Sequence, residues 1–399
     1  MTAQPRYALE DRLPQWSSQR ASDPVYRDEQ AGMWRLLDYS TVAAVLADPA
    51  TFSSDLSPLA PAPPDFEVFR TGMFVGMDPP DHRKLRTLVS QAFTPRTVAG
   101  LEPRIRAITA GLLDAVSGEP RVDLVSALAY PLPILVIAEL LGIPASDREL
   151  FETWARVLFG GDQLSELATV AEVQAALEKI SPTIREMNEY VLAHIRRPHP
   201  PDSLMGKLIA AEVDGERLTD QEMVGFVALL MVAGHITTTA LIGNAAVLLD
   251  RHPDAAAALR ADPALLPGAL EEVLRCLPPF NELGRRTTAE VVLGGQVIPP
   301  NSIVMANVGS ANRDPAQFTD PDTFDIFRAP NPHLTFGKGI HFCIGAPLAR
   351  LEGRVAYEQL LGRYQDLAIA AGEPVEFQNP ALIVSVRKLV LDVAPRTVA

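Results

Sequence analysis

The chain has 399 residues, 47% of them hydrophobic, and a formal net charge of −14. This composition indicates a folded protein with a large core and excludes a disordered or fibrous one, and the acidic balance excludes a general nucleic-acid binder. Cys276 and Cys343 are the only cysteines, so we expect a reducing cytoplasm and no disulfide framework. The first sixteen residues do not have the pattern of a signal peptide, and no membrane anchor is expected.

The first half of the chain is predicted to be mainly helical. A Pro-rich stretch at 53–80 is typical of a linker or of a long loop over a site. Hydrophobic periodicity predicts helices over 81–93, 103–117, 123–142, 146–159 and 168–196, the last of them broken at Pro182.

The longest predicted helix begins at Thr219-Asp220-Gln221-Glu222, which fits a capping box, and runs to about Asp250. About 30 residues at 1.5 Å each span about 45 Å, so this helix must cross the core. It is apolar enough to resemble a membrane span, but its centre, MVAGHITTTA at 231–240, carries Gly, His and three Thr. A buried helix of a soluble protein is therefore the favoured interpretation.

Strand signals come later in the chain. Residues 289–300 predict a hairpin around Gly294-Gly295, residues 302–308 predict a strand, and residues 381–393 predict a C-terminal hairpin. No alternation of strands and helices is visible, which argues against a Rossmann-type domain. The predicted fold class is mainly α with small β-sheets.

The segment FGKGIHFCIGAPLARLE at 336–352 is the most informative part of the sequence. Its glycines form a tight loop around Cys343, and Pro347 suits the first turn of a helix that follows. A cysteine before a helix N-terminus is favoured as a thiolate, which can be a nucleophile or a metal ligand. An inert buried cysteine is the plainer alternative, a nucleophile would need a base such as His341, and a zinc site would need more ligands.

Phe336, Gly339, Cys343 and Gly345, followed by Leu348-Ala349-Arg350, resemble the haem-binding loop of the cytochrome P450 family, in a soluble bacterial member. The resemblance spans about residue 30 to the C-terminus and implies one domain over 1–399, with the long helix above a buried haem b. It implies that Cys343 is the axial ligand of the iron and that the loop glycines approach the haem. Thiolate ligation pushes electron density toward O–O cleavage.

Other segments carry the same resemblance. Glu272-Val273-Leu274-Arg275 and the later Arg328 match a structural Glu–Arg–Arg cluster of the family, although a Glu–Arg pair alone is more often a surface salt bridge. For the two haem propionates the resemblance points to His341, Arg285, His82 and Arg86. His82 and Arg86 share one helix face, and counting back from Gly294-Gly295 selects Arg285 over Arg286. A solvated surface charge is the alternative for each.

In the long helix the family pattern Ala-Gly-x-acid-Thr aligns with Ala233 to Thr237. The resemblance implies that Ala233 and Gly234 leave room for dioxygen where the helix opens locally, and that Thr237 manages protons. The acid position holds Ile236, which cannot relay protons. Two hypotheses remain: protons arrive through water and the Thr237 and Thr238 hydroxyls or a substrate hydroxyl, or coupling is poor and peroxide is released. His235 carries little weight as a substitute relay.

The resemblance also implies an apolar substrate pocket, with polar contacts from Asn281 and Glu282. Its expected lining residues are Val75, Leu229, Leu230, Ala233, Phe280, Asn281, Leu283, Leu382 and Ile383. The expected function is a monooxygenase that hydroxylates or epoxidises a sizeable apolar secondary metabolite, free or carrier-bound.

No flavin or iron–sulfur motif is visible in the sequence. Electrons are therefore expected from NAD(P)H through a ferredoxin reductase and a ferredoxin, docked on Lys338, Arg83, Lys84 and Arg350. The enzyme is expected to be a cytoplasmic monomer. A peroxide-driven or redox-neutral haem-thiolate enzyme, or a haem-based sensor, remains the alternative.

Overall fold

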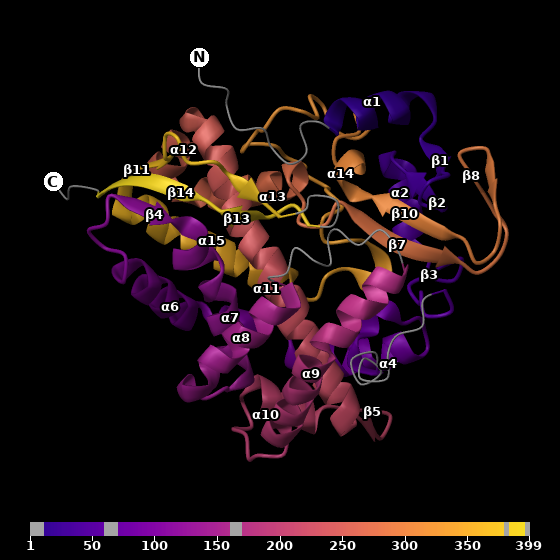
Figure 1. The fold of residues 1–399 in the computed structure, drawn as a ribbon, viewed down its shortest axis with the longest axis horizontal. Coiled ribbons are helices and arrows are strands. Elements are labelled where there is room, and N and C mark those ends of the chain that lie inside the picture. The colour runs from indigo at the N-terminus through magenta and orange to yellow at the C-terminus, as the bar shows by residue number, and fades with distance from the viewer. Residues whose placement is uncertain (1–11, 60–70, 160–169, 379–382, 396–399) are drawn as a thin grey trace. The chain divides into compact units, whose positions relative to one another are not determined.

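A computed structural model describes residues 12–59, 71–159, 170–378 and 383–395 (Figure 1). The chain divides into two compact units. The first unit comprises Met1–Ser53, Arg106–Tyr130 and Thr237–Ala399, and the second comprises Ser54–Ile105 and Pro131–Ile236. The boundary therefore falls inside two helices, α6 (Glu102–Asp114) and α11 (Asp220–Arg251).

The first unit contains a five-stranded sheet of order β1-β2-β10-β7-β3. Its strands are β1 (Val25–Asp28), β2 (Met33–Leu36), β10 (Ile303–Asn307), β7 (Glu282–Thr287) and β3 (Phe52–Ser53). β2 and β10 are parallel, and the other pairs are antiparallel. Helix α2 (Tyr39–Ala47) buries Val42 and Leu46 against Leu36 and Val304 of the sheet.

Smaller sheets complete the strands of this unit. β8 (Val291–Leu293) and β9 (Gln296–Ile298) form the predicted hairpin, with Gly294 and Gly295 at φ 54° and 79°. β14 (Val390–Pro395) lies between β11 (Tyr364–Ile369) and β4 (Arg121–Asp123), whereas β13 (Val386–Lys388) pairs with β12 (Glu376–Phe377). The predicted C-terminal hairpin is therefore wrong. Only Leu389 separates β13 from β14, which is too short for a hairpin turn.

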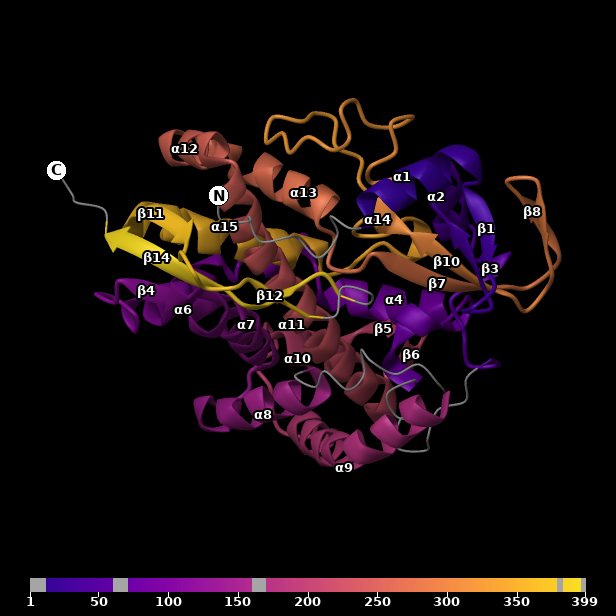
Figure 2. The ribbon, with the colours of Figure 1, turned by 45° about the horizontal axis from the view of Figure 1, so that its top comes forward.

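In the first unit α15 (Ala346–Arg363) packs against α12 (Pro253–Ala261) and α13 (Leu266–Cys276), whereas α1 (Leu13–Ser22) packs against the short α14 (Val308–Ala311). α13 lies beside α15 in both ribbon views (Figures 1 and 2). Gly353 of α15 faces Leu241 of α11, because a Cβ there would lie 3.1 Å from Leu241 Cδ2. The Tyr357 hydroxyl donates to the carbonyl of Ile242 over 2.7 Å, so α15 is also joined to α11.

The second unit is mainly helical. Its helices are α4 (Asp81–Ala92), α5 (Pro95–Ala99), α7 (Pro131–Leu141), α8 (Arg148–Phe159), α9 (Val170–Ile195) and α10 (Leu204–Ala210), with a hairpin of β5 (Glu212–Val213) and β6 (Glu216–Arg217). The helices predicted at 81–93 and 146–159 are confirmed. Pro182 does not break α9, since Ile184, Met187 and Val191 beyond it are buried and stabilise the helix.

The single helix predicted over 123–142 is instead two elements. A π-helical turn, η3 (Val125–Ala129), follows β4, and its Tyr130 N–H donates to the Val125 carbonyl over 2.9 Å. α7 then begins at Pro131, which suits the first helical position because it lacks an N–H to satisfy.

The long helix and its capping box are confirmed. α11 has 32 residues, Glu222 Oε2 accepts from the Thr219 N–H over 2.7 Å, and Thr219 Oγ1 accepts from the Glu222 N–H over 3.2 Å. α11 is α-helical throughout, so the expected local opening is wrong. By length and composition it passes for a membrane span, but 78% of its apolar window is buried, as in a core helix. Asn244 joins it to its surroundings by donating to the carbonyls of Leu277 and Val384.

Candidate functional site

The loop around Cys343 is shaped by glycines and fixed by backbone hydrogen bonds. Gly337 and Gly339 have φ of 74° and 71°, and a Cβ on Gly339 would lie 3.0 Å from Ala47 Cα. The Cys343 N–H donates to the Phe336 carbonyl over 2.9 Å. A short turn, η7 (Gly339–His341), precedes the cysteine, and α15 begins three residues after it. The thiol is therefore presented, half-buried, beside a helix N-terminus.

Arg350 of α15 supports this loop from behind. Its guanidinium lies 4.5 Å from the Phe336 ring centroid, and it donates to both carboxylate oxygens of Glu271 over 2.7 and 2.8 Å. Burial favours the neutral Glu271 carboxyl, but Arg350 and His333 outweigh it and lower its pKa to about 2. Arg350 thus anchors α15 to α13. Its side chain is 40% exposed, and its expected role as a docking cation stays a prediction.

Glu272, Arg275 and Arg328 are brought together in the first unit. The Glu272 carboxylate is fully buried and accepts from Arg275 Nε over 2.8 Å, from Arg275 Nη2 over 2.7 Å and from Arg328 Nε over 3.1 Å. The Asp325 N–H and the Asn331 amide complete its shell. Burial raises the pKa of Glu272, but the two arginines and the Asp325 N–H lower it overall, so the group is ionised. Cys276 beside it is buried, and burial raises the pKa of its thiol.

Two predicted haem cations lie in the first unit. Arg285 of β7 is only 8% exposed, whereas its neighbour Arg286 points to the opposite face and donates to Asn301 Oδ1 over 2.8 Å. The two arginines therefore lie on opposite faces of the strand, and the choice of Arg285 as a haem partner stays a prediction. His341 lies half-buried in η7, within the cysteine loop.

The other two predicted haem cations, on α4, meet at one aromatic ring of the second unit. The buried His82 imidazole lies edge-on to Phe74, with centroids 5.9 Å apart, and the Arg86 guanidinium lies 5.5 Å from the Phe74 ring. Burial and the nearby Arg86 charge lower the pKa of His82. Phe74 was not predicted from the sequence, since its role depends on these contacts.

The centre of α11 has one open face. Ala233 is exposed and Thr237, one turn later, is half-buried, whereas His235 and Ile236 are only 1% and 6% exposed. A Cβ on Gly234 would lie 3.0 Å from Ile137 Cδ1 of α7, so glycine at this position accommodates the packing of α7. The expected room for dioxygen stays a prediction.

Some of the predicted pocket residues are exposed, and others are buried. Phe280 is 38% exposed and pairs with Ile383 in an isolated β-bridge, Val75 is 49% exposed, and Leu229 and Leu230 are buried in α11. Leu382 lies outside the described residues.

Three residues of the Phe280–Leu283 segment have close contacts within the first unit. Asn281 is 1% exposed, and its Oδ1 lies 2.7 Å from where a Cβ on Gly309 would be. Leu283 packs against the core of the five-stranded sheet. Glu282 accepts from Arg35 over 2.6 and 2.7 Å and from Asn307 over 3.0 Å. These side chains have contacts within the first unit, and the expectation that they line the pocket stays a prediction.

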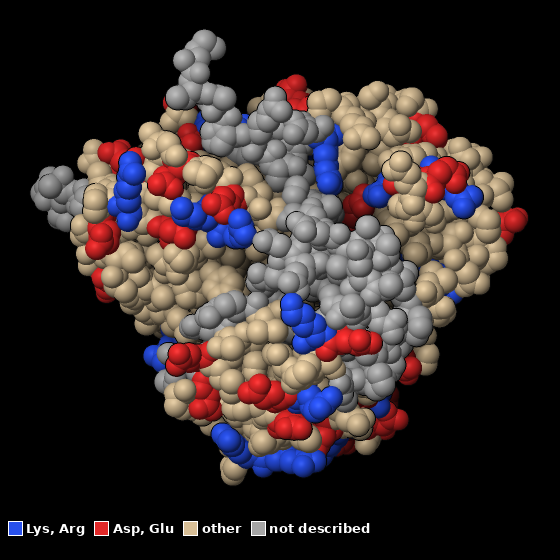
Figure 3. Space-filling view, in the orientation of Figure 1, with Lys and Arg blue, Asp and Glu red and all other residues tan. Residues whose placement is uncertain are grey.

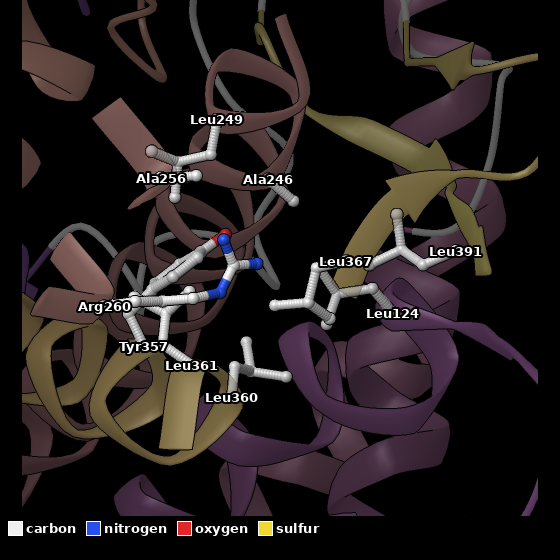
Figure 4. Close-up of a pocket in the computed structure, with 10 residues that line it drawn as sticks. All are labelled: Leu124, Ala246, Leu249, Ala256, Arg260, Tyr357, Leu360, Leu361, Leu367 and Leu391. Atoms are coloured by element: carbon white, nitrogen blue, oxygen red, sulfur yellow. The ribbon is translucent and has the colours of Figure 1, made fainter. Parts of the chain in front are cut away.

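A separate pocket lies near the C-terminal half of α15 (Figure 4). Figure 4 shows Arg260 beside Tyr357 on one side and Leu124 and Leu391 on the other. None of the predicted site residues is among its ten lining residues: Leu124, Ala246, Leu249, Ala256, Arg260, Tyr357, Leu360, Leu361, Leu367 and Leu391.

The cysteine loop fits the haem that the resemblance implies. Within the described ranges no group of three or more His, Cys, Asp or Glu is placed to hold a metal ion, so Cys343 offers a single thiolate ligand. A single thiolate suits an iron whose other ligands come from a macrocycle. Ile340 and Phe342 beside it are 36% and 42% exposed and offer apolar surface to a ring system. On the face seen in Figure 3, acidic and basic side chains are interspersed rather than gathered into a basic surface.

Comparisons with known proteins agree with this geometry. A family model described as Cytochrome P450 matches residues 167–390. The chain is 41% identical over 394 residues to the cyclomarin C epoxidase CymV of Salinispora arenicola, covering 98% of both chains. It is 42% identical over 374 residues to the erythromycin C-12 hydroxylase of Saccharopolyspora erythraea, covering 92% of this chain and 90% of the relative. The solved structure of HmtN, a post-tailoring hydroxylase of himastatin biosynthesis, matches with a TM-score of 0.84 and 44% identity over 98% of both chains.

Proposed function

The chain belongs to the cytochrome P450 family and is a monooxygenase of it, and on this premise we propose that it hydroxylates or epoxidises a sizeable apolar secondary metabolite such as a polyketide or macrolide. The single observation that carries the proposal is the glycine-shaped loop that presents Cys343 beside the N-terminus of α15. The substrate class is supported by the relatives, which are named for the epoxidation of cyclomarin C and the hydroxylation of erythromycin.

Haem b, when bound at Cys343, would supply the centre at which O₂ is activated: two electrons and two protons would be consumed, one oxygen atom would go to the substrate and the other would leave as water. Cys343 provides the thiolate, and the loop N–H groups and the helix N-terminus stabilise its charge. Arg285 and Arg86 provide cations for the two propionates, and the rings of His341 and His82 provide N–H donors. The Glu272 cluster holds the segments behind the loop, which makes it structural rather than catalytic.

Thr237 and Ile236 define the handling of protons. The Thr237 hydroxyl is both donor and acceptor and lies on the same face of α11 as the exposed Ala233, so it can hold a water molecule and pass its proton on. Ile236 is apolar and buried and has no proton to give. Protons therefore reach this face through water and the hydroxyls of Thr237 and Thr238, or through a hydroxyl of the substrate.

The proposed apolar contacts to the substrate are Val75, Leu229 and Leu230 of the second unit, and Phe280 and Ile383 of the first. Electrons come from NAD(P)H through a ferredoxin and its reductase, and the enzyme acts as a single-domain monomer in the cytoplasm. The retained Thr237 favours the dioxygen route over a peroxide-driven one.

The decisive variant is Ile236→Glu, with Ile236→Leu as the control. If an acid is wanted at this position, the Glu variant raises the product formed per NAD(P)H consumed, whereas the Leu variant leaves it unchanged. Unchanged coupling and rate in a folded Glu variant would rule out the need for an acid. Turnover with hydrogen peroxide alone that equals turnover with NAD(P)H, ferredoxin and reductase would favour the peroxide-driven alternative. Spectral titration of the haem with a panel of macrolides and polyketides tests the substrate class.

A further inference from the structure

We propose that Phe74 is a positioning residue that sets His82 and Arg86 for the haem propionates, and that the contact of Gly72 with α11 fixes Phe74 in place. The inference rests on the proposed role of His82 and Arg86 as propionate partners. The proposed contacts link the turn that carries the predicted pocket residue Val75 to His82 and Arg86, the proposed propionate partners.

Gly72 is seated directly on the backbone of α11. A Cβ at this position would lie 2.2 Å from the Glu222 carbonyl oxygen, 2.6 Å from the Phe226 nitrogen and 2.7 Å from Gly225 Cα. No side chain fits there without displacing the loop or the helix, because the obstructing atoms are backbone. The close approach therefore requires glycine at 72 and brings Phe74, two residues later, against the same part of α11.

Phe74 stands at the centre of the contacts that follow. Its side chain is 2% exposed and stacks on Phe226 of α11, with ring centroids 6.2 Å apart and an interplanar angle of 21°. The imidazole of His82 meets the ring edge-on, and the guanidinium of Arg86 lies over it. Both α4 side chains therefore take their orientation from this ring, through an aromatic edge contact and a cation–π contact.

The same turn carries Val75. Phe74, Val75 and Gly76 form the 3₁₀ turn η2, in which the Gly76 N–H donates to the Met73 carbonyl and the Met77 N–H to the Phe74 carbonyl. Phe74 points inward and Val75 is 49% exposed. A displacement of this turn consequently moves the pocket wall and the ring that orients His82 and Arg86 together.

The test measures the rate of haem transfer from the holoenzyme to excess apomyoglobin. Phe74→Leu keeps apolar volume but removes the ring, and it is expected to release haem about five- to tenfold faster than the unmodified enzyme. Phe74→Tyr keeps the ring and is expected to release haem as slowly as the unmodified enzyme. Gly72→Ala is expected to match Phe74→Leu. Gly76→Ala is the matched control, because a Cβ on Gly76 has no neighbour within 4 Å.

Further measurements separate positioning from simple destabilisation. Because both variants act through the same ring, Gly72→Ala combined with Phe74→Leu should release haem no faster than either alone, and multiplied effects would overturn the inference. An unchanged haem release rate in Phe74→Leu would also overturn the inference. A faster release rate that is fully accounted for by a lower unfolding midpoint would overturn it too. If Arg86→Gln leaves haem release unchanged, the propionate assignment fails; if it accelerates release while Phe74→Leu does not, only the role of Phe74 fails.

Discussion

Replacement of Glu271 by Gln is expected to weaken the attachment of α15 behind the cysteine loop. Glu271 lies in α13 and accepts two hydrogen bonds from Arg350, which covers Phe336 at the start of that loop. Gln keeps the shape of the side chain but loses the charge and one acceptor. The change should therefore lower stability and loosen the segment that presents Cys343.

The magnitude follows from the pKa of Glu271. A pKa lowered by Arg350 and His333 together from its ordinary value of 4.5 to about 2 corresponds to roughly 3.5 kcal/mol, at about 1.4 kcal/mol per pH unit. The side chains of Arg350 and Glu271 are 40% and 25% exposed, so water screens the pair and about 1–2 kcal/mol is expected. Because the pKa is lowered by folding, this stability is present above pH 4.5 and is lost as the pH falls toward about 2.

The assay is a double-mutant cycle of Glu271→Gln and Arg350→Gln, followed by urea unfolding at pH 7 and at steps down to pH 3.5. The expected coupling free energy between the two substitutions is about 1–2 kcal/mol at pH 7, and it should become smaller below pH 4.5. Asp114 and Arg363, a more exposed pair at the other end of α15, serve as the control and should couple by less than about 1 kcal/mol. Equal coupling in the two cycles, or a Glu271 effect that does not change with pH, would refute the reasoning.

Two further substitutions test buried groups of the first unit. Glu352 of α15 is 1% exposed, its Oε2 has no hydrogen-bond partner among the described residues, and burial raises its pKa well above the ordinary value. Glu352→Gln should therefore raise the unfolding midpoint near neutral pH, and the gain should vanish below about pH 4.5, where the carboxyl is protonated in both states; a gain that persists at pH 4 would contradict a neutral buried acid. Asn244→Leu leaves the carbonyls of Leu277 and Val384 without this donor and should cost about 2–3 kcal/mol in urea unfolding at pH 7, and a loss below about 0.5 kcal/mol would show that the two bonds do not anchor α11.

The parts of the structure that the sequence predicted well depend on local signals. The start of α11 is marked by Thr219 and Glu222 three residues apart, and the β8–β9 turn by two adjacent glycines. The cysteine loop is likewise one continuous segment. In each case the residues that determine the geometry are neighbours in the chain, so their spacing is sufficient.

The parts that were missed or mispredicted depend on distant residues. Glu271 and Arg350 are 79 positions apart, and the contact of Gly72 with Gly225 joins two segments that show no shared pattern. Pro182 was predicted to end a helix that burial of later residues maintains. The contact of Gly234 with Ile137 of another helix was likewise not visible in the sequence.

The close contact of Gly72 with the backbone of α11 also limits how this enzyme can be redesigned for other substrates. A library that randomises the 71–77 turn wholesale would lose the members with a side chain at 72, since every one of them collides with the backbone of α11. Val75 projects from the same turn and is exposed, so it tolerates a wide range of side chains. Keeping glycine at position 72 while randomising position 75 would confine the sequence diversity to a position where the fold accepts different side chains.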